Sequence, residues 1–440
     1  MSVKNIQFPN GFRLVYEKSN SEIPLTSYHV FCNLGPGHET EKLKGASHFI
    51  EHMCFKGTKK IPESKEISLV YDKIGAYFNA FTEKRYTCYT VDCQSKYAFN
   101  CLNMLSDMVL NSIFDKKEYN KEHKVVIEEN TDDLNDPLEL AYNAINKELF
   151  DGSSFEKPID HVDFHRKGHL KYEDVVDMYN HFYTQNNLIL SVVSNLSLEQ
   201  FQKFLPKTYF LKNSAQKNSI SFNNLNFYVK PKSNISYVIE KKNGISNITL
   251  MIGFRVCGFH HEDKPILELL KVCLGKNMSG RLKYILREEK GLVYSAYIDD
   301  MYFEEIGGYT FVTQTDVKNL LGKNGVLNTV IDILRNLINK GITTEELRIV
   351  KGTIEGDNII DLQTTSNRCL YNGETVLYNP EITSIIPYKD VYDKTFKHIT
   401  KAQVDQVIKK YFTPENMSVC IVGQKVPSIQ QIKNVCEKLF

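Results

Sequence analysis

Long apolar runs are missing from this 440-residue sequence, and no stretch approaches the length that a helix needs to span a bilayer. A charge excess of either sign is missing too, because 54 Lys and Arg residues face 53 Asp and Glu residues for a formal net charge of +1. That balance gives no electrostatic basis for binding nucleic acid or an anionic membrane surface. We therefore expect neither nucleic acid nor a membrane among the partners.

Paired cysteine motifs are also missing. The ten cysteines are scattered, without a C-x-x-C pair. This usage is typical of buried free thiols in a reducing compartment rather than of a disulfide framework. The segment MSVKNIQFPNGFRLVYEKSN has neither the apolar core of a signal peptide nor the Arg- and Ser-rich character of a transit peptide. These features together predict a cytoplasmic protein.

The chain is too long for one ordinary core, and internal repeats divide it. HLKYEDVVDMYNHFYTQNNLILSVVSN (169–195) resembles HITKAQVDQVIKKYFTPENMSVCIVGQ (398–424), since in both a helical period leads through two aromatics and Thr into a strand pattern. FRLVYEKSN (12–20) echoes ISYVIEKKN (235–243) at nearly the same offset. One domain type is therefore predicted to occur twice. The predicted boundaries are an N-terminal domain at 1–213, a polar linker rich in Ser and Asn at 214–234, and a homologous C-terminal domain at 235–440.

Helical and strand patterns alternate inside each copy. Apolar residues recur at helical spacing from Ser64 and stop at Gly75, and YTCYTVDC then alternates as a strand. A long helical stripe covers 98–113, and Asp115 with Glu118 forms a start signal for another helix. The mixture predicts an α+β fold in which helices pack on one sheet in each domain.

The stretch HFIEH, residues 48–52, carries the clearest chemical signal. On a helix, His48 and His52 lie one turn apart on the same face, and Glu51 lies beside them. Two imidazoles and a carboxylate suit a hydrolytic zinc, which needs nitrogen ligands, an open position for water and a base. H-x-x-E-H is the inverted form of the zinc motif H-E-x-x-H. By itself a five-residue motif could equally be the polar face of an ordinary amphipathic helix.

A catalytic zinc needs a third protein ligand, and EHKVVIEEN at 122–130 offers one. Val125 and Val126 are expected to form the apolar face of this helix, with Glu122 and Glu129 two turns apart along one stripe. Glu129 is the predicted ligand, and Glu122 the carboxylate that orients a ligand histidine or supports the water. Glu128 points elsewhere by helical geometry and is interpreted as a surface residue.

These segments resemble a known family. HFIEHMCFKGTKKIP followed by EHKVVIEE is similar to the pitrilysin/insulysin family of zinc peptidases, including the β subunit of the mitochondrial processing peptidase and short bacterial homologues. The resemblance implies His48, His52 and Glu129 as ligands of one zinc ion per chain, with Glu51 as general base. It also implies two duplicated α+β domains, each a mostly antiparallel sheet packed with helices, which together form half of a clamshell.

The resemblance extends to two substrate-binding segments. GAYFNAFTEKRYTCY (75–89) is similar to the family's edge strand, which implies that Asn79, Ala80 and Phe81 bind extended peptide by β-augmentation. SGRLKYILREEKGLVYS (279–295) is similar to the substrate-binding stretch of the second domain, where Arg287 and Tyr294 match a paired Arg and Tyr. Arg can bind a peptide carbonyl or carboxylate, and the Tyr hydroxyl can donate to the developing oxyanion. GKNMSGRL departs from the family's Gly/Ser-rich run, which leaves specificity open.

The sequence therefore predicts a zinc endopeptidase that hydrolyses peptides or unstructured segments, as a homodimer or a heterodimer. Three alternatives remain: a subunit of a heterodimeric processing peptidase, a noncatalytic scaffold of the same fold, and a peptide-binding module that keeps zinc for structure. HVDFHRKGH places His161, His165 and His169 four apart, which we interpret as a turn with a surface or structural role rather than a second metal site. Cys54 is interpreted as a buried thiol rather than a redox switch.

Overall fold

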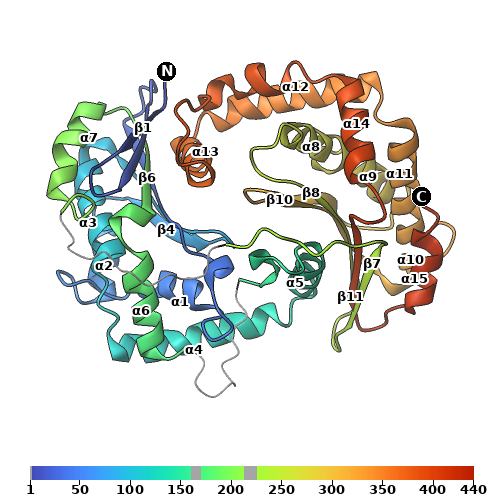
Figure 1. The fold of residues 1–440 in the computed structure, drawn as a ribbon, viewed down its shortest axis with the longest axis horizontal. Coiled ribbons are helices and arrows are strands. Elements are labelled where there is room, and N and C mark those ends of the chain that lie inside the picture. The colour runs from blue at the N-terminus through green and yellow to red at the C-terminus, as the bar shows by residue number, and fades with distance from the viewer. Residues whose placement is uncertain (1, 160–169, 213–224) are drawn as a thin grey trace. The chain divides into compact units, whose positions relative to one another are not determined.

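A computed structural model describes residues 2–159, 170–212 and 225–440, and their contacts divide the chain into two compact units (Figure 1). The first unit comprises residues 1–131, 159–225 and 359–390, and the second comprises 132–158, 226–358 and 391–440. The histidine cluster at 161–169 lies outside the described residues. Each unit is built around one sheet with helices against it, so the predicted α+β class is confirmed.

The first unit contains a six-stranded sheet in the order β1-β2-β6-β3-β5-β4. Its strands are β1 (Lys4–Gln7), β2 (Arg13–Lys18), β3 (Leu25–Cys32), β4 (Tyr77–Thr82), β5 (Thr87–Gln94) and β6 (Leu188–Ser194). Its helices are α1 (Ala46–Met53), α2 (Ser64–Asp72), α3 (Ala98–Leu110), α4 (Lys116–Asp133, shared with the second unit), α6 (Tyr172–Phe182), α7 (Leu198–Phe204) and α13 (Thr365–Tyr378). Helix starts follow local chemistry, since Asp115 accepts hydrogen bonds from the amides of Lys117 and Glu118 at the start of α4.

The second unit contains a five-stranded sheet in the order β7-β11-β8-β10-β9. Its strands are β7 (Ser236–Lys241), β8 (Asn247–Cys257), β9 (Ala296–Tyr302), β10 (Ile306–Asp316) and β11 (Met417–Gly423). Its helices are α5 (Pro137–Leu149), α8 (Lys264–Lys271), α9 (Arg281–Lys283), α10 (Val317–Leu320), α11 (Val326–Lys340), α12 (Thr344–Asp361, shared with the first unit), α14 (Lys401–Tyr411) and α15 (Ile429–Cys436).

The two sheets share one topology, which supports a duplicated domain. In the first, β2 and β6 run parallel, and the pairs β6–β3, β3–β5 and β5–β4 are antiparallel. In the second, β7 and β11 run parallel, and β11–β8, β8–β10 and β10–β9 are antiparallel. The repeats in the sequence correspond to β2 and β7, and to the pairs α6–β6 and α14–β11. The first unit adds β1 at one edge.

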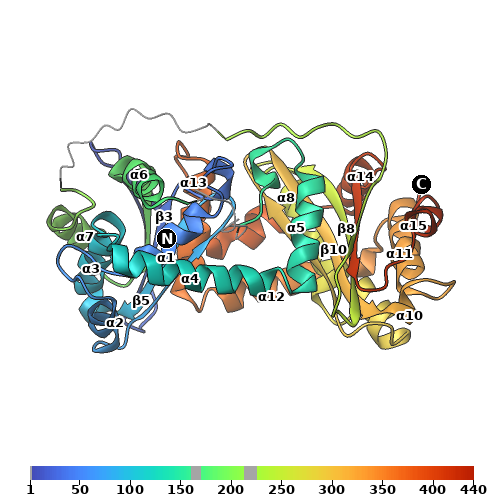
Figure 2. The same ribbon diagram turned by 90° about the horizontal axis from the view of Figure 1, so that it is seen from below.

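One helix of each unit comes from the other half of the sequence. Helix α13 packs on β6, β3 and β2 of the first sheet, although 170 residues lie between the end of β6 at Ser194 and the start of α13 at Thr365. Helix α5 packs on β11, β8 and β7 of the second sheet, and Figure 2 shows it beside β8. The expected division near residues 214–234 does not anticipate this exchange, because it depends on packing rather than on chain order.

Polar contacts fasten α13 to the first sheet. Arg368 Nη1 donates to Glu17 Oε1 over 2.9 Å, and the two side chains are 7% and 4% exposed. Asn372 Nδ2 donates to the other oxygen, Oε2, over 2.8 Å. Gly373 brings the helix close, because a Cβ added there would lie 2.0 Å from Cε2 of the fully buried Phe31 ring. The interface therefore combines a buried ion pair with a close backbone approach.

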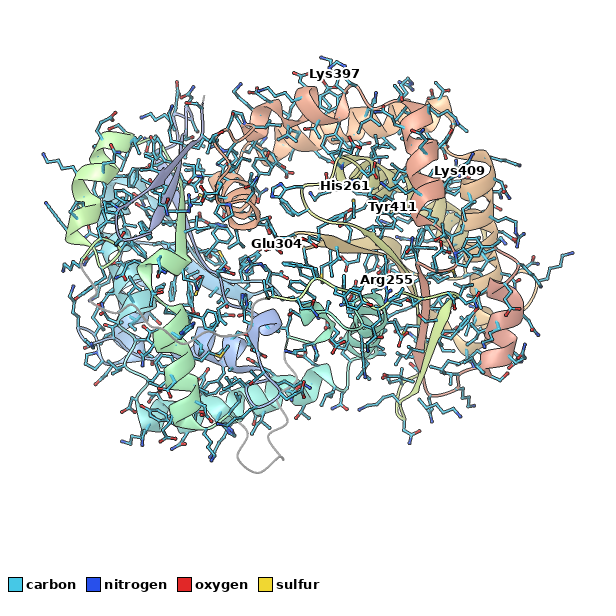
Figure 3. All side chains as sticks on the ribbon, in the orientation of Figure 1. Arg255, His261, Glu304, Lys397, Lys409 and Tyr411 are labelled. Carbon is cyan, nitrogen blue, oxygen red and sulfur yellow. The ribbon has the colours of Figure 1, made fainter. Side chains whose placement is uncertain are left out.

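At the second sheet the close approach is on the strand side. A Cβ on Gly253 of β8 would lie 2.9 Å from Cδ1 of Leu149, the last residue of α5. Arg255, labelled in Figure 3, donates from Nε to the carbonyl of Leu149 over 2.7 Å and from Nη2 to that of Glu148 over 2.9 Å. Carbonyls in the last turn of a helix lack helical partners, so Arg255 satisfies the end of α5.

We expect Gly373→Ala to destabilise the first unit by about 1–3 kcal/mol, because the added methyl group must displace the Phe31 ring in a packed core. Gly352→Ala is the matched control, since Gly352 lies within α12 and a Cβ there meets nothing within 4 Å. The control is expected to be neutral or to stabilise by up to about 1 kcal/mol. Urea unfolding followed by circular dichroism measures both. Equal effects of the two substitutions would contradict the close approach.

All ten cysteines are buried free thiols, which confirms that part of the cysteine prediction. Burial raises the pKa of the Cys54 thiol to about 12, which keeps it protonated and unreactive at neutral pH. Among the residues that the structure describes, no helix combines the length and apolar character needed to cross a bilayer.

Candidate metal centre

Helix α1 carries the H-x-x-E-H motif and is anchored to the core of the first unit by its apolar face. Phe49, Ile50 and Met53 are fully buried in the core of the first unit, so the histidines are directed to the opposite face. The helix starts at Gly45, whose φ of +80° belongs to the left-handed region that favours glycine. The buried Glu39 carboxylate accepts from the amide of Gly45 over 2.7 Å and from that of Ser47 over 2.8 Å, which satisfies the helix start.

The three predicted ligands converge. His48, His52 and Glu129 each offer a ligand atom, and these atoms lie within 4.8 Å of one another. His52 Nε2 lies 3.1 Å from His48 Nε2 and 3.6 Å from Glu129 Oε2. The structure therefore brings Glu129 of α4 to the two histidines, and its role as a metal ligand stays a prediction.

Glu122 contacts His52 from behind. Its Oε1 lies 2.9 Å from His52 Nδ1, and its Oε2 lies 2.7 Å from Lys56 Nζ. The bond to Oε1 requires a proton on Nδ1, which leaves the lone pair of Nε2 directed into the cluster. Burial raises the pKa of the Glu122 carboxyl, but the hydrogen bonds from His52 and Lys56 outweigh burial and hold this pKa below its usual value. Glu122 therefore stays ionised and orients the His52 ring.

The donor set fits zinc. Nitrogen and carboxylate ligands lie about 2.0–2.2 Å from zinc, so ligand atoms of a tetrahedral site are about 3.3 Å apart. The separations of 3.1 Å and 3.6 Å bracket this value. Two imidazoles and one carboxylate make three protein ligands, which is the number that leaves the fourth position to water in a hydrolytic site.

Glu51 lies on α1 beside these ligands and is only 8% exposed. Its Oε2 accepts a hydrogen bond from Thr82 Oγ1 over 2.6 Å. Thr82 is the last residue of β4, against which α1 packs. The motif glutamate is thus held at the sheet as well as on its helix.

The segment predicted to bind substrate is an edge strand. β4 pairs with β5 on one side and ends the sheet on the other, so one row of its backbone groups has no partner strand in the described part of the chain. Asn79 is exposed, while Ala80 and Phe81 are half-buried. The Asn79 side chain accepts from the amide of Ala80 over 2.9 Å. The strand has the geometry that β-augmentation requires.

Arg287 and Tyr294 belong to the second unit, whereas the predicted metal ligands belong to the first. The Arg287 guanidinium carbon lies 5.2 Å from the centre of the Tyr294 ring, so the two predicted residues form a cation–π pair. Tyr294 is 84% exposed. Arg287 lies in a π-helical turn, Tyr284–Glu289, a local irregularity that is frequent at functional sites. The role of Arg287 and Tyr294 in binding substrate at the candidate metal site stays a prediction.

Comparisons with known proteins identify the family of the chain. The family model described as insulinase (peptidase family M16) matches residues 14–161, and the one described as peptidase M16 inactive domain matches residues 169–353. The uncharacterized zinc protease YmxG of Bacillus subtilis is 30% identical over 384 residues, which cover 85% of this chain and 88% of that protein. The chain belongs to peptidase family M16. An uncharacterized zinc protease of Streptomyces coelicolor is 24% identical over 83% of this M16 chain and 78% of its own length.

Solved structures share the fold of this M16 chain. A protease from Helicobacter pylori matches with a TM-score of 0.86 and 19% identity, covering 96% of this chain and 99% of that one. A peptidase M16 inactive domain from Pseudomonas fluorescens matches with a TM-score of 0.82 and 17% identity, covering 97% and 99%. The family models and the 30% identical relative confirm the family resemblance found in the sequence, and these structures confirm the fold.

Sequence reasoning missed two side chains of this M16 site and misplaced one. Lys56 holds Glu122, and its position four residues after His52 was the signal available, although α1 already ends at Met53. Thr82 holds Glu51, and no sequence pattern pointed to it. Val125 was expected on the apolar face of α4, but it is 40% exposed while Val126 is fully buried, because adjacent helical residues point about 100° apart.

Proposed function

We propose that this M16 chain is a zinc-dependent endopeptidase that hydrolyses peptides or unstructured segments. The observation that carries the proposal is the convergence of His48, His52 and Glu129, with Glu51 adjacent on the same helix. The printed names of the relatives as zinc proteases support it. A peptide seated along β4 would be held by its backbone, which favours extended segments over folded proteins.

His48, His52 and Glu129 would hold the ion, and Glu122 with Lys56 would keep His52 in the ligating tautomer. When bound, zinc supplies a Lewis acid for the scissile carbonyl and lowers the pKa of water. Glu51 takes the proton of the attacking water as the new C–O bond forms, and passes it to the amine as the C–N bond breaks. Arg287 and Tyr294 would bind the peptide and donate a hydrogen bond to the developing oxyanion.

The family resemblance supports a homodimer or a heterodimer as the working form, with peptide as the substrate. The cluster of three ligands and a base favours the enzyme over the scaffold, since a scaffold has no need of Glu51 beside an open metal position.

Removal of the metal tests the proposal. The purified full chain, loaded with one equivalent of zinc, is incubated with a pool of unstructured peptides, and fragments are identified by mass spectrometry. We expect chelation followed by dialysis to abolish cleavage, and one equivalent of Zn²⁺ to restore the same fragments. Added Mg²⁺ should not restore cleavage, because this ion prefers oxygen ligands in octahedral geometry. Unchanged cleavage after chelation, or none by the zinc-loaded chain, would contradict a self-sufficient zinc peptidase.

A further inference from the structure

The hydrogen bond between Thr82 and Glu51 joins the edge strand to the motif helix. Thr82 Oγ1 donates to Glu51 Oε2 over 2.6 Å, within the short range expected when the acceptor is charged. Thr82 is half-buried and Glu51 is buried, so the bond lies largely out of bulk water. A hydrogen bond to a charged group in such a place contributes more than one on the surface.

Thr82 is itself held firmly. It pairs with Thr87 at the closed end of the β4–β5 hairpin, and its Oγ1 lies 3.4 Å from Thr87 Oγ1. Thr87 is fully buried and donates to the Leu34 carbonyl over 2.8 Å. Beyond Thr82 the turn closes through a bond from the Glu83 amide to the Tyr86 carbonyl over 2.7 Å. The β-branched side chain has few χ1 choices, so the hydroxyl position is determined by the sheet.

A glutamate carboxylate, in contrast, has little preference of its own. Its terminal torsion is broad and roughly twofold, so the plane of the two oxygens follows its neighbours. A general base must meet the reacting proton within hydrogen-bond reach and in the right direction. The orientation of the Glu51 carboxylate therefore depends on a donor of fixed position, and Thr82 is such a donor.

We infer that Thr82 is a positioning residue for Glu51 and sets the catalytic orientation of its carboxylate, an inference that rests on the proposed peptidase function. Because Thr82 lies three residues after Asn79 on the same strand, β4 would serve both sides of the reaction. Its outer edge would pair with the peptide, and its last side chain would hold the base.

Kinetics of three variants of the zinc-loaded full chain test the inference. Thr82→Val removes the hydroxyl at nearly constant volume, and Thr82→Ser keeps it. Thr26→Val is the matched control, because Thr26 lies on β3 of the same sheet and its hydroxyl bonds Ser194 Oγ over an equal 2.6 Å. We expect Thr82→Val to lower kcat by about tenfold to a hundredfold, the range of one hydrogen bond to a charged group. KM and zinc affinity should change by less than about threefold.

Thr82→Ser should recover kcat to within about threefold of wild type, and Thr26→Val should leave it unchanged even if it lowers stability. The inference would be overturned if Thr82→Val raised KM or weakened zinc binding and left kcat unchanged. Equal losses of kcat in Thr82→Val and Thr26→Val would overturn it too. Retained cleavage by Glu51→Gln would instead rule out Glu51 as the base, and unchanged cleavage after chelation would refute the proposed function, so both failures differ from a failure of the Thr82 inference.

A double-mutant cycle tests the hydrogen bond between Thr82 and Glu51 without a catalytic assay. The unfolding of zinc-free wild type, Thr82→Val, Glu51→Ala and the double variant is compared in urea. A direct bond predicts that the effects on the folding equilibrium constant are coupled by about fivefold or more. Additive effects would overturn the inference even if no peptide substrate is cleaved.

Discussion

Replacing Glu51 by glutamine is expected to lower kcat for peptide hydrolysis by about 10³-fold, which corresponds to about 4 kcal/mol in the activation barrier. Glutamine has the shape of glutamate and can accept the hydrogen bond from Thr82, but it cannot take a proton from water. KM should stay within about threefold, since the peptide is bound by other groups. The zinc content should stay near one ion per chain, because Glu51 is not among the three converging ligands.

Glu128→Gln provides the control for this result. Glu128 undergoes the same chemical change, lies next to the proposed ligand Glu129 on α4, and is exposed. Its kcat should remain within about twofold of wild type. Kinetics on one peptide chosen from the cleaved pool, together with metal analysis of each variant, provide the measurement. A Glu51→Gln enzyme that keeps most of its activity would rule out Glu51 as the base, whatever the metal content.

Replacing Arg368 by methionine is expected to destabilise the first unit by about 3–5 kcal/mol. The substitution leaves Glu17, with its 4% exposed side chain, without the guanidinium that now contacts Oε1. Asn372 still donates to Oε2, but an amide does not neutralise a buried charge. Because the chain contains no tryptophan, urea unfolding is best followed by circular dichroism and by hydrogen exchange at the α13 amides.

Two further variants separate the buried charge from other effects. Arg348→Met removes a helical arginine whose pair with Glu345 is exposed, at 73% and 63%, so it should cost less than about 1 kcal/mol. The double variant Glu17→Leu with Arg368→Met removes both charges and should recover much of the lost stability. A single Arg368→Met substitution no worse than Arg348→Met would show that the ion pair does not hold α13 in place.

Residues that act through local spacing could be predicted from the sequence. His48, Glu51 and His52 lie within one and a half turns of α1, and Glu122 and Glu129 lie on one stripe of α4. Helical periodicity is therefore enough to group the residues within each helix. The start of α4 at Asp115 and the end of α2 before Gly75 follow from capping chemistry in the same way. The duplication could be read because both copies keep the same order of helix and strand.

Contacts between distant segments could not be predicted in this way. Thr82 reaches Glu51 because the end of β4 passes beside α1, and no residue near Thr82 in the sequence reports that proximity. The attachment of α13 to the first sheet depends on Arg368 meeting Glu17 across 351 residues of sequence. Side-chain complementarity at such a distance has no periodic signature, so it becomes visible only when both surfaces are known.

The exchange of α5 and α13 has a consequence for synthesis of the chain. The first sheet is complete once β6 leaves the ribosome, but the helix that covers Phe31 and Val15 follows far behind it. Until α13 is synthesised, the first sheet exposes an apolar surface to water. This surface carries Glu17, which is buried in the complete structure. Such surfaces are prone to aggregation and attract chaperones. The main core of each unit lies within one half of the sequence, at residues 12–210 and 248–439, but neither half on its own supplies helices for both faces of its sheet.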